Sequence, residues 1–245
     1  MIIKKYIPWW GKIIVKVILS RVPIDYSLWQ SSGLFRHGSM DSVEYALGIF
    51  NSHAQRSGFK EFLVNKTVLE LGPGDSVATA LIARAYGARA ILVDVGPFAR
   101  SDLEPYRTLT NKLAEDLSAE PPNFTQIDTF NDLLNACNAS YLTEGLESLR
   151  LLPDASVDFI FSQAVLEHVR KQEFSETISE LIRILKPQGV CSHRIDLRDH
   201  LGGKLNNLRF REAIWESNFF AKSGFYTNRI QMHSMLNIFQ KAGFM

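Results

Sequence analysis

Short apolar runs alternate along this chain with longer stretches whose apolar residues recur at helical spacing. Five of the runs have the length and composition of buried strands, at about 67–71, 89–95, 139–143, 156–162 and 189–196. Five stretches predict helices, at about 76–86, 103–118, 126–136, 172–186 and 231–242. Strands separated by helices favour right-handed crossovers. We therefore predict an α/β fold, a Rossmann-like doubly wound parallel sheet of about five strands with helices on both faces.

The part of the chain before the first strand has a different character. Residues 23–60 are predicted to be helical and contain no strand signal, and Val43, Ala46, Leu47 and Phe50 form an apolar stripe at helical spacing. We predict two parts: a helical extension or lid at 1–60, and the alternating domain at 61–245.

Residues 1–21 combine basic side chains with the pair Trp9-Trp10. Lys12 and Lys16 lie one helical turn apart, and aliphatic residues occupy most of the remaining circumference. One interpretation is a helix in the membrane interface, with tryptophans at headgroup level. The other is a helix packed on the domain or on a second copy. Lys16 interrupts the apolar run, which argues against a signal peptide.

Composition narrows the class of protein. At 46% hydrophobic, the 245 residues can bury a sizeable core, and the net charge of +1 gives no basic face for nucleic acid. Cys137 and Cys191 are too few for a disulfide framework. No run of about 18 uncharged apolar residues is present, so a membrane span is not expected. A cytoplasmic location follows, with peripheral membrane contact through residues 1–21 as the alternative; the oligomeric state stays open.

A glycine turn follows the first strand. The segment 68–76 has the sequence VLELGPGDS, and Asp94 ends the second strand 20 residues after Gly74. This pair describes a nucleoside pocket at the carboxyl edge of a parallel sheet. Val77 occupies the place of the third glycine that dinucleotide folds use for close approach to a pyrophosphate. A ligand that carries an ammonium group instead of a pyrophosphate would tolerate Val77 and make use of the acid at Glu70.

At these residues the chain resembles the class I S-adenosylmethionine-dependent methyltransferases. The resemblance continues through 152–169, LPDASVDFIFSQAVLEHV, and through 181–190, LIRILKPQGV. It covers roughly residues 55–200 in the family's order, and it implies S-adenosylmethionine as the cofactor. The segments 162–169 and 194–200 look similar to those of bacterial methyltransferases associated with surface polysaccharides. The resemblance thus implies methyl transfer, with O-methylation of a small molecule or saccharide expected first and N-methylation next.

The resemblance also assigns the cofactor site. Glu70 would hold the ammonium group, Asp94 would accept the ribose hydroxyls, and the end of the fourth strand would face the donor. Gly145 aligns with an acid that often binds adenine, so Glu144 or the backbone at Leu146 would substitute. The expected cofactor-binding residues are Glu70, Gly72, Gly74, Ser76, Asp94, Leu146, Ser162 and Gln163.

The residues after the fifth strand offer a base for an acceptor hydroxyl. Alternation would send His193 and Ile195 to one face of the sheet, and Asp196 to the other. We predict His200 as the base, oriented by Asp196 or Asp199, because a histidine beside a carboxylate is a plausible proton acceptor. A polar loop with internal ion pairs is the alternative.

No metal is expected. Some family members bind a divalent ion through Glu-x-x-Glu-His at the start of the fourth helix, but Ala164 replaces the first glutamate here. Glu167 and His168 alone are a sparse ligand set. His168 is expected to line the cleft or to pack structurally.

The last predicted helix is followed only by 243–245, where the family continues into strands six and seven. We expect those two strands to be missing, which leaves strand five as an edge. Either the chain is a fragment, or residues 201–230 or a partner cover that edge.

Two rival functions stay open. One is a nicotinamide-dependent oxidoreductase, which the absent third glycine disfavours. The other is a truncated, non-catalytic binding protein, which the missing strands suggest.

Overall fold

The structure, a computed structural model of the 245-residue chain, describes residues 11, 42–59, 63–117, 122–200 and 205–244. These residues divide into two compact units. The sheet unit contains the described residues of 42–163 and 179–194. The C-terminal unit contains those of 164–178 and 195–244. The boundary predicted at residue 60 stays a prediction, because almost all of 1–41 lies outside the described residues.

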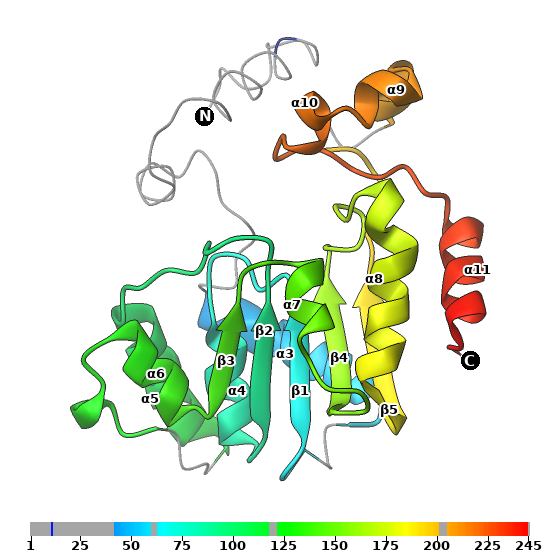
Figure 1. Cartoon of the computed structure of the whole chain (residues 1–245). Coiled ribbons are helices and arrows are strands. Elements are labelled where there is room, and N and C mark those ends of the chain that lie inside the picture. Colours follow the sequence, from blue (N-terminus) through cyan, green and yellow to red (C-terminus); the bar gives the residue numbers. More distant parts are fainter. Residues whose placement is uncertain (1–10, 12–41, 60–62, 118–121, 201–204, 245) are drawn as a thin grey trace. The chain divides into compact units, whose positions relative to one another are not determined.

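The sheet unit has a five-stranded sheet in the order β3-β2-β1-β4-β5 (Figure 1). The strands are β1 (Thr67–Leu71), β2 (Arg89–Val93), β3 (Ala139–Leu142), β4 (Val157–Gln163) and β5 (Leu185–Arg194). All neighbouring strands are parallel. This confirms the predicted fold class, and β5 lies at an edge of the sheet.

Helices connect the strands. They are α3 (Val43–Arg56), α4 (Ala78–Ala85), α5 (Glu104–Leu117), α6 (Phe130–Ala136), α7 (Leu146–Arg150) and α8 (Lys171–Ile184), with a 3₁₀ turn η2 (Phe124–Gln126). The apolar stripe predicted before the first strand is confirmed: Ala46 and Phe50 of α3 are fully buried in one core cluster with residues of α4 and β4, and the Phe50 ring meets that of Phe161 edge-on, with the ring centres 5.8 Å apart. α3 therefore packs on the sheet as part of its core.

The strand register aligns the carboxyl ends of the strands that precede the site. Leu71, the last residue of β1, pairs with Ser162 of β4, and Ser162 pairs with His193 of β5. Because paired positions of parallel strands point to the same face, Glu70, Phe161 and Ser192 form the preceding row on the opposite face. That opposite face is the one that α3 and α4 cover.

Four predicted boundaries were wrong. The helix expected to end at 186 ends at Ile184, and β5 begins at Leu185 because this residue pairs with Val157, ahead of an irregularity in the β4–β5 register. β5 also ends at Arg194, so the alternation expected through Asp196 stops earlier. The helix expected from 126 begins at Phe130, where Thr129 and Asp132 form a reciprocal capping box.

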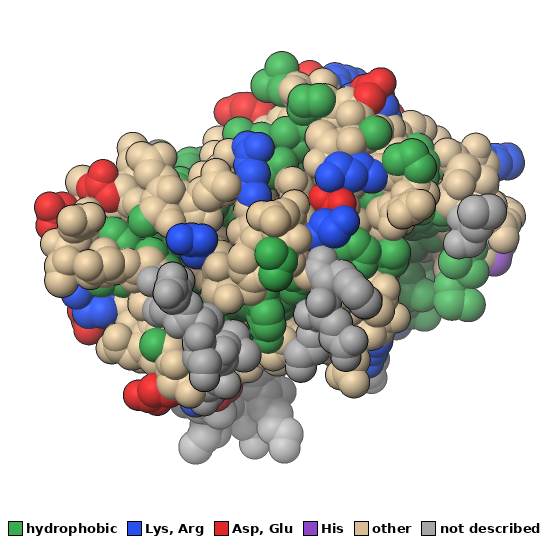
Figure 2. Space-filling view, turned by 90° about the horizontal axis from the view of Figure 1, so that it is seen from below, with side chains coloured by type: hydrophobic (Ala, Val, Ile, Leu, Met, Phe, Trp, Pro, Cys, Tyr) green, Lys and Arg blue, Asp and Glu red, His purple; other side chains and the backbone are tan. Residues whose placement is uncertain are grey.

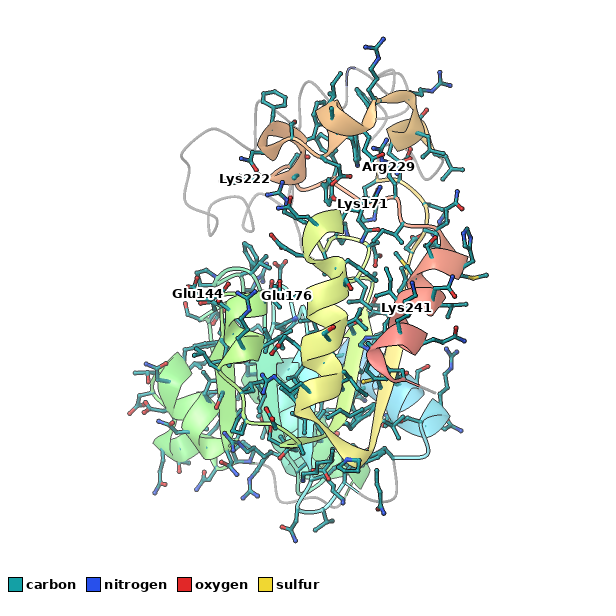
Figure 3. The ribbon with its side chains drawn as sticks, turned by 45° about the vertical axis from the view of Figure 1, so that its right-hand side comes forward. Glu144, Lys171, Glu176, Lys222, Arg229 and Lys241 are labelled. Carbon is teal, nitrogen blue, oxygen red and sulfur yellow. The ribbon has the colours of Figure 1, made fainter. Side chains whose placement is uncertain are left out.

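The C-terminal unit contains the beginning of α8, the 3₁₀ turn η3 (Asn206–Arg209), and the helices α9 (Glu212–Trp215), α10 (Asn218–Ala221) and α11 (Met232–Ala242). Trp215 is fully buried and donates its indole N–H to the Thr227 carbonyl at 2.7 Å. The guanidinium of Arg229, labelled in Figure 3, lies 5.7 Å from the centre of the Trp215 ring and donates to the Phe210 carbonyl at 3.0 Å. These contacts give the unit its own small core.

Figure 2 views the molecule from the side on which the strands begin. Acidic and basic side chains are interspersed with apolar ones on this face. At this end of the sheet Asp158 accepts a hydrogen bond from Lys186 at 2.7 Å and pairs with Lys66 at 3.3 Å. Among the described residues no helix is long and apolar enough to cross a membrane. The interfacial helix proposed for residues 1–21 lies outside the described residues.

Candidate functional site

The glycine turn after β1 is tied to the end of β2. Gly72 and Gly74 both adopt positive φ angles, 72° and 66°, which L-residues with a side chain rarely adopt. The backbone N–H of Gly74 donates to Asp94 Oδ2 at 2.9 Å, and the N–H of Val95 donates to Asp94 Oδ1 at 2.7 Å. Asp94 is only 9% exposed. The carboxylate predicted to bind ribose thus also fixes the turn predicted to hold the methionine portion.

Glu70 is buried directly before this turn, with 2% of its surface exposed. Its Oε2 has no hydrogen-bond partner within the described part of the chain. The pKa of Glu70 is raised to about 8, mainly by burial; the Thr79 hydroxyl opposes this rise, and the negative charge of Asp94 contributes to it. A buried carboxylate oxygen that lacks a donor fits the ammonium group of an amino-acid ligand.

Ser76, another predicted cofactor residue, is buried at the beginning of α4. Its Oγ accepts a hydrogen bond from the N–H of Ala78 at 3.2 Å. Val77, in the place of the absent third glycine, is fully buried in the core and is the N-cap of α4. The structure therefore gives Ser76 a structural contact and Val77 a packing role.

The loop after β3 explains why Gly145 stands where the resembled family often has an acid. This residue has a φ of 54°, and a Cβ at its position would lie 2.9 Å from Cγ1 of Val95. Its N–H donates to the Asp94 carbonyl at 2.8 Å, which joins the loop after β3 to the end of β2. A larger acid does not fit this backbone. Leu146 begins the short helix α7, which the sequence analysis did not predict.

Ser162 and Gln163, predicted to face the donor, close β4 and are each held by a histidine. Ser162 Oγ lies 2.8 Å from His193 Nδ1, and Gln163 Oε1 lies 3.2 Å from His53 Nε2. Burial, with a smaller contribution from the nearby His53, lowers the pKa of His193 to about 4. His53 was missed by the sequence analysis. The available signal was its place on the apolar stripe of α3, three residues after Phe50.

The three residues predicted to supply the base all lie in the C-terminal unit. Asp196 forms a two-point ion pair with Arg198, and this pair holds the pKa of Asp196 at about 2, with a smaller contribution from His200. Asp199 is buried and accepts hydrogen bonds from the backbone N–H groups of Asn206 and Asn207. Asp199 therefore fixes a loop, whereas Asp196 contributes a charge near His200. Their catalytic roles stay predictions.

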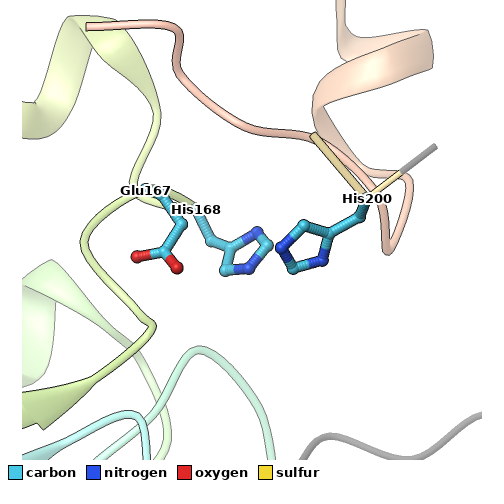
Figure 4. A group of neighbouring side chains, drawn as sticks. All are labelled: Glu167, His168 and His200. Carbon is cyan, nitrogen blue, oxygen red and sulfur yellow. The ribbon is translucent and has the colours of Figure 1, made fainter. Parts of the chain in front are cut away.

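One group of side chains in the C-terminal unit could hold a metal ion. Ligand atoms of Glu167, His168 and His200 lie within 4.8 Å of one another (Figure 4). His168 Nδ1 lies 2.7 Å from the Tyr226 carbonyl, so Nδ1 carries the proton and Nε2 has the lone pair. Two imidazoles and one carboxylate suit a first-row transition ion. The absence of a metal, expected from the sparse Glu167–His168 pair, stays a prediction.

Comparison with known proteins identifies the family to which the chain belongs. A family model described as a methyltransferase domain matches residues 43–245. A search of curated proteins found no match. Among solved structures, the chain resembles a putative sarcosine dimethylglycine methyltransferase from Galdieria sulphuraria, with 18% identity, a TM-score of 0.49, and coverage of 82% of this chain and 62% of that one.

Two further structures give similar values. An S-adenosylmethionine-dependent methyltransferase from Archaeoglobus fulgidus has 14% identity and a TM-score of 0.45, with 83% of this chain and 70% of that one covered. A complex of the Haloferax volcanii Trm112 activator with a putative methyltransferase has 17% identity and a TM-score of 0.47, with 91% of this chain and 77% of that one covered.

The family match spans most of the sequence, and the parallel sheet carries the glycine turn, Glu70 and Asp94 at the ends of β1 and β2. The chain therefore belongs to the methyltransferase-domain family, as a class I S-adenosylmethionine-dependent methyltransferase.

Proposed function

We propose that this protein transfers the methyl group of S-adenosylmethionine to a hydroxyl group of a small molecule or saccharide. The observation that carries the proposal is the buried Oε2 of Glu70, which has no hydrogen-bond partner among the described residues. It lies directly before the glycine turn, where the amino-acid end of the donor would bind. A buried carboxylate in this state is costly to the folded protein unless a ligand cation occupies the site.

The donor side of the site follows from the same residues. Glu70 would hold the ammonium group, the turn at Gly72 and Gly74 would allow close approach of the methionine portion, and Asp94 would accept the ribose hydroxyls. S-adenosylmethionine supplies a methyl group that is already activated by the positive charge on sulfur. The protein therefore mainly has to align the two reactants and exclude water.

On the acceptor side, the hydroxyl oxygen forms the new bond to the methyl carbon while the carbon–sulfur bond of the donor breaks, which leaves S-adenosylhomocysteine, and the hydroxyl group must lose its proton. We assign that proton to His200, with Asp196 supplying a nearby negative charge. The saccharide class rests on the resemblance of segments 162–169 and 194–200 to methyltransferases of surface-polysaccharide biosynthesis. The net charge of +1 gives no reason to expect a nucleic-acid acceptor.

The rival oxidoreductase function would require room for a pyrophosphate at the glycine turn. Val77 is fully buried where such folds have their third glycine, and it packs between helix and sheet. Glu70 would also place a carboxylate close to a doubly charged anion, which is unfavourable. Both features disfavour a nicotinamide dinucleotide.

Calorimetric titration with S-adenosylmethionine and, separately, with the reduced nicotinamide dinucleotides distinguishes these functions. The proposal expects binding of the first ligand only, and it expects Glu70→Gln to weaken that binding. Transfer of a labelled methyl group to a panel of sugars and phenols then identifies the acceptor class. Donor binding without transfer to any acceptor would favour the non-catalytic alternative, and binding of the dinucleotides alone would overturn the proposal.

A further inference from the structure

His53 connects helix α3 to the ends of two strands. It is 5% exposed, and its ring centre lies 5.3 Å from that of Phe161 in β4. Its Nδ1 lies 2.7 Å from Ser192 Oγ, and its Nε2 lies 3.2 Å from Gln163 Oε1. All of these residues belong to the sheet unit. A buried imidazole with a polar partner at each nitrogen is held in one orientation.

The two contacts determine which nitrogen carries the proton. Gln163 Oε1 can only accept a hydrogen bond, so His53 must donate to it from Nε2. In the neutral ring Nδ1 then has the lone pair, and the Ser192 hydroxyl donates to it. The order of donation therefore runs from Ser192 to His53 and from His53 to Gln163.

This order fixes the polarity of the Gln163 side chain. Because the amide oxygen is turned toward His53, the amide nitrogen with its two N–H donors points away from it. Gln163 is the last residue of β4, and its neighbour Ser162 pairs with Leu71, directly before the glycine turn. Gln163 thus ends at the rim where ligands of open parallel sheets bind.

We propose that His53 is a positioning residue of the donor site: together with Ser192 it orients Gln163 so that the amide presents N–H donors to an oxygen atom of the bound donor. The inference rests on the proposed function, because it takes S-adenosylmethionine as the ligand. The oxygen that best suits two N–H donors is a carboxylate oxygen of the methionine portion.

The charges around His53 support its neutral form. Burial lowers its pKa, and the positive charges of Arg56 on α3 and Arg194 on β5 lower it further, whereas the hydrogen bond to Gln163 opposes this shift. His193, on the neighbouring row of β5, has a lowered pKa for the same main reason. At neutral pH the ring is therefore uncharged, as the order of donation requires.

Inverting the polarity of Gln163 provides the sharpest test. Gln163→Glu keeps the acceptor that faces His53 and replaces the outward N–H donors with a carboxylate oxygen. Gln163→Met removes both functions without adding charge. S-adenosylhomocysteine is the calorimetric probe, because it lacks the sulfonium charge that could mask a local repulsion. The matched control is Gln188→Glu, the same change at an exposed residue near the opposite end of the sheet.

We expect Gln163→Glu to raise the dissociation constant of S-adenosylhomocysteine by about 10- to 100-fold and Gln163→Met by less, because a lost or inverted donor leaves a ligand oxygen unsatisfied. The control should bind like the wild type. If Gln163→Glu binds as tightly as the wild type or more tightly, the amide oxygen faces the ligand and the inference is overturned. If the wild-type protein does not bind the probe at all, it is the proposed function that fails.

A second pair of variants tests His53 itself. His53→Ala should weaken probe binding by about 3- to 10-fold, while His53→Gln, whose amide N–H can replace Nε2–H, should restore most of the affinity. A purely structural role for His53 predicts that both variants lose thermal stability without this difference in binding. If His53→Ala does not fold, the Gln163→Glu and Gln163→Met variants still test the inference, because they leave His53 unchanged.

Discussion

The backbone N–H of Gly74 donates a hydrogen bond to Asp94 Oδ2 at 2.9 Å, which joins the turn after β1 to the end of β2. Both residues were predicted to contact the cofactor, Gly74 at the methionine portion and Asp94 at the ribose. Through this bond, one carboxylate controls the shape of the turn as well as the ribose position. Donor binding should therefore respond to Asp94 in two separable ways.

Asp94→Ala should weaken S-adenosylmethionine binding by roughly 1–3 kcal/mol, because the ribose hydroxyls and the Gly74 N–H lose a charged acceptor. Asp94→Asn keeps one oxygen for the Gly74 N–H and should cost less. Isothermal titration calorimetry on both variants, with circular dichroism to confirm folding, measures the difference. An unchanged affinity in folded Asp94→Ala protein would remove the ribose assignment.

Glu70 should make donor binding depend on pH. In the free protein its pKa is raised to about 8, mainly by burial. Because the bound ammonium group favours the ionised carboxylate, binding below pH 8 must first release a proton. We expect affinity to fall as the pH is lowered from 8, by at most about tenfold per pH unit.

The α-amino group of the ligand also titrates near pH 8. The informative quantity is therefore the difference between the wild type and Glu70→Gln, titrated in parallel from pH 6 to 9. Only the wild type should show the loss of donor affinity below pH 8 that we attribute to Glu70. Parallel curves for the two proteins would mean that Glu70 does not bind the ammonium group.

The same residue should affect stability without ligand. The folded-state pKa of Glu70 is raised to about 8 from the ordinary value of 4.5. Its contribution is therefore fully present below pH 4.5 and is lost as the pH rises to about 8, by at most about 1.4 kcal/mol per pH unit. Denaturant unfolding of the wild type and Glu70→Gln should show the wild type losing stability relative to the variant across that range. An equal pH dependence would place the carboxyl in a more solvated site.

The positions of Glu70, the glycine turn and Asp94 could be predicted because they follow one another locally, at the ends of strands whose apolar pattern is strong. His53 could not be predicted in the same way. Its partners Gln163 and Ser192 are 110 and 139 residues away, and only the order of β1, β4 and β5 beneath α3 brings them to it. The start of β5 was also misplaced, since pairing of Leu185 with Val157 overrides the local signal of Pro187.

The roles of Asp196 and Asp199 show a second limit of prediction from the sequence. Both are acidic residues just after β5, and their sequence positions suggest equal access to His200. The structure separates them: Asp196 pairs with Arg198, while Asp199 accepts hydrogen bonds from the backbone of the segment that leads into η3. Side-chain partners of this kind depend on how the loop folds back, which periodicity does not encode.

His200 is the predicted base, and its replacement gives the last test. If His200 accepts the proton of the acceptor hydroxyl, His200→Ala should lower turnover by roughly 10²–10⁴ while the donor affinity stays nearly constant. Turnover is measured with the labelled donor and the best acceptor from the screen, and donor affinity by calorimetry. The motivation is the place of His200 after β5, with the negative charge of Asp196 nearby.

His168 is the matched control, because its ring centre lies 4.7 Å from that of His200 while its Nδ1 is bonded to the Tyr226 carbonyl. If His168 only shapes the site, His168→Gln should reduce turnover much less than His200→Ala. A fully active His200→Ala enzyme beside an inactive His168→Gln enzyme would reverse the two roles. Equal loss of turnover in both variants would instead point to a metal site formed with Glu167. In that case a chelator should inactivate the wild type, and added zinc or manganese should restore its turnover. Loss of folding in His200→Ala alone would assign this histidine to the packing of the C-terminal unit.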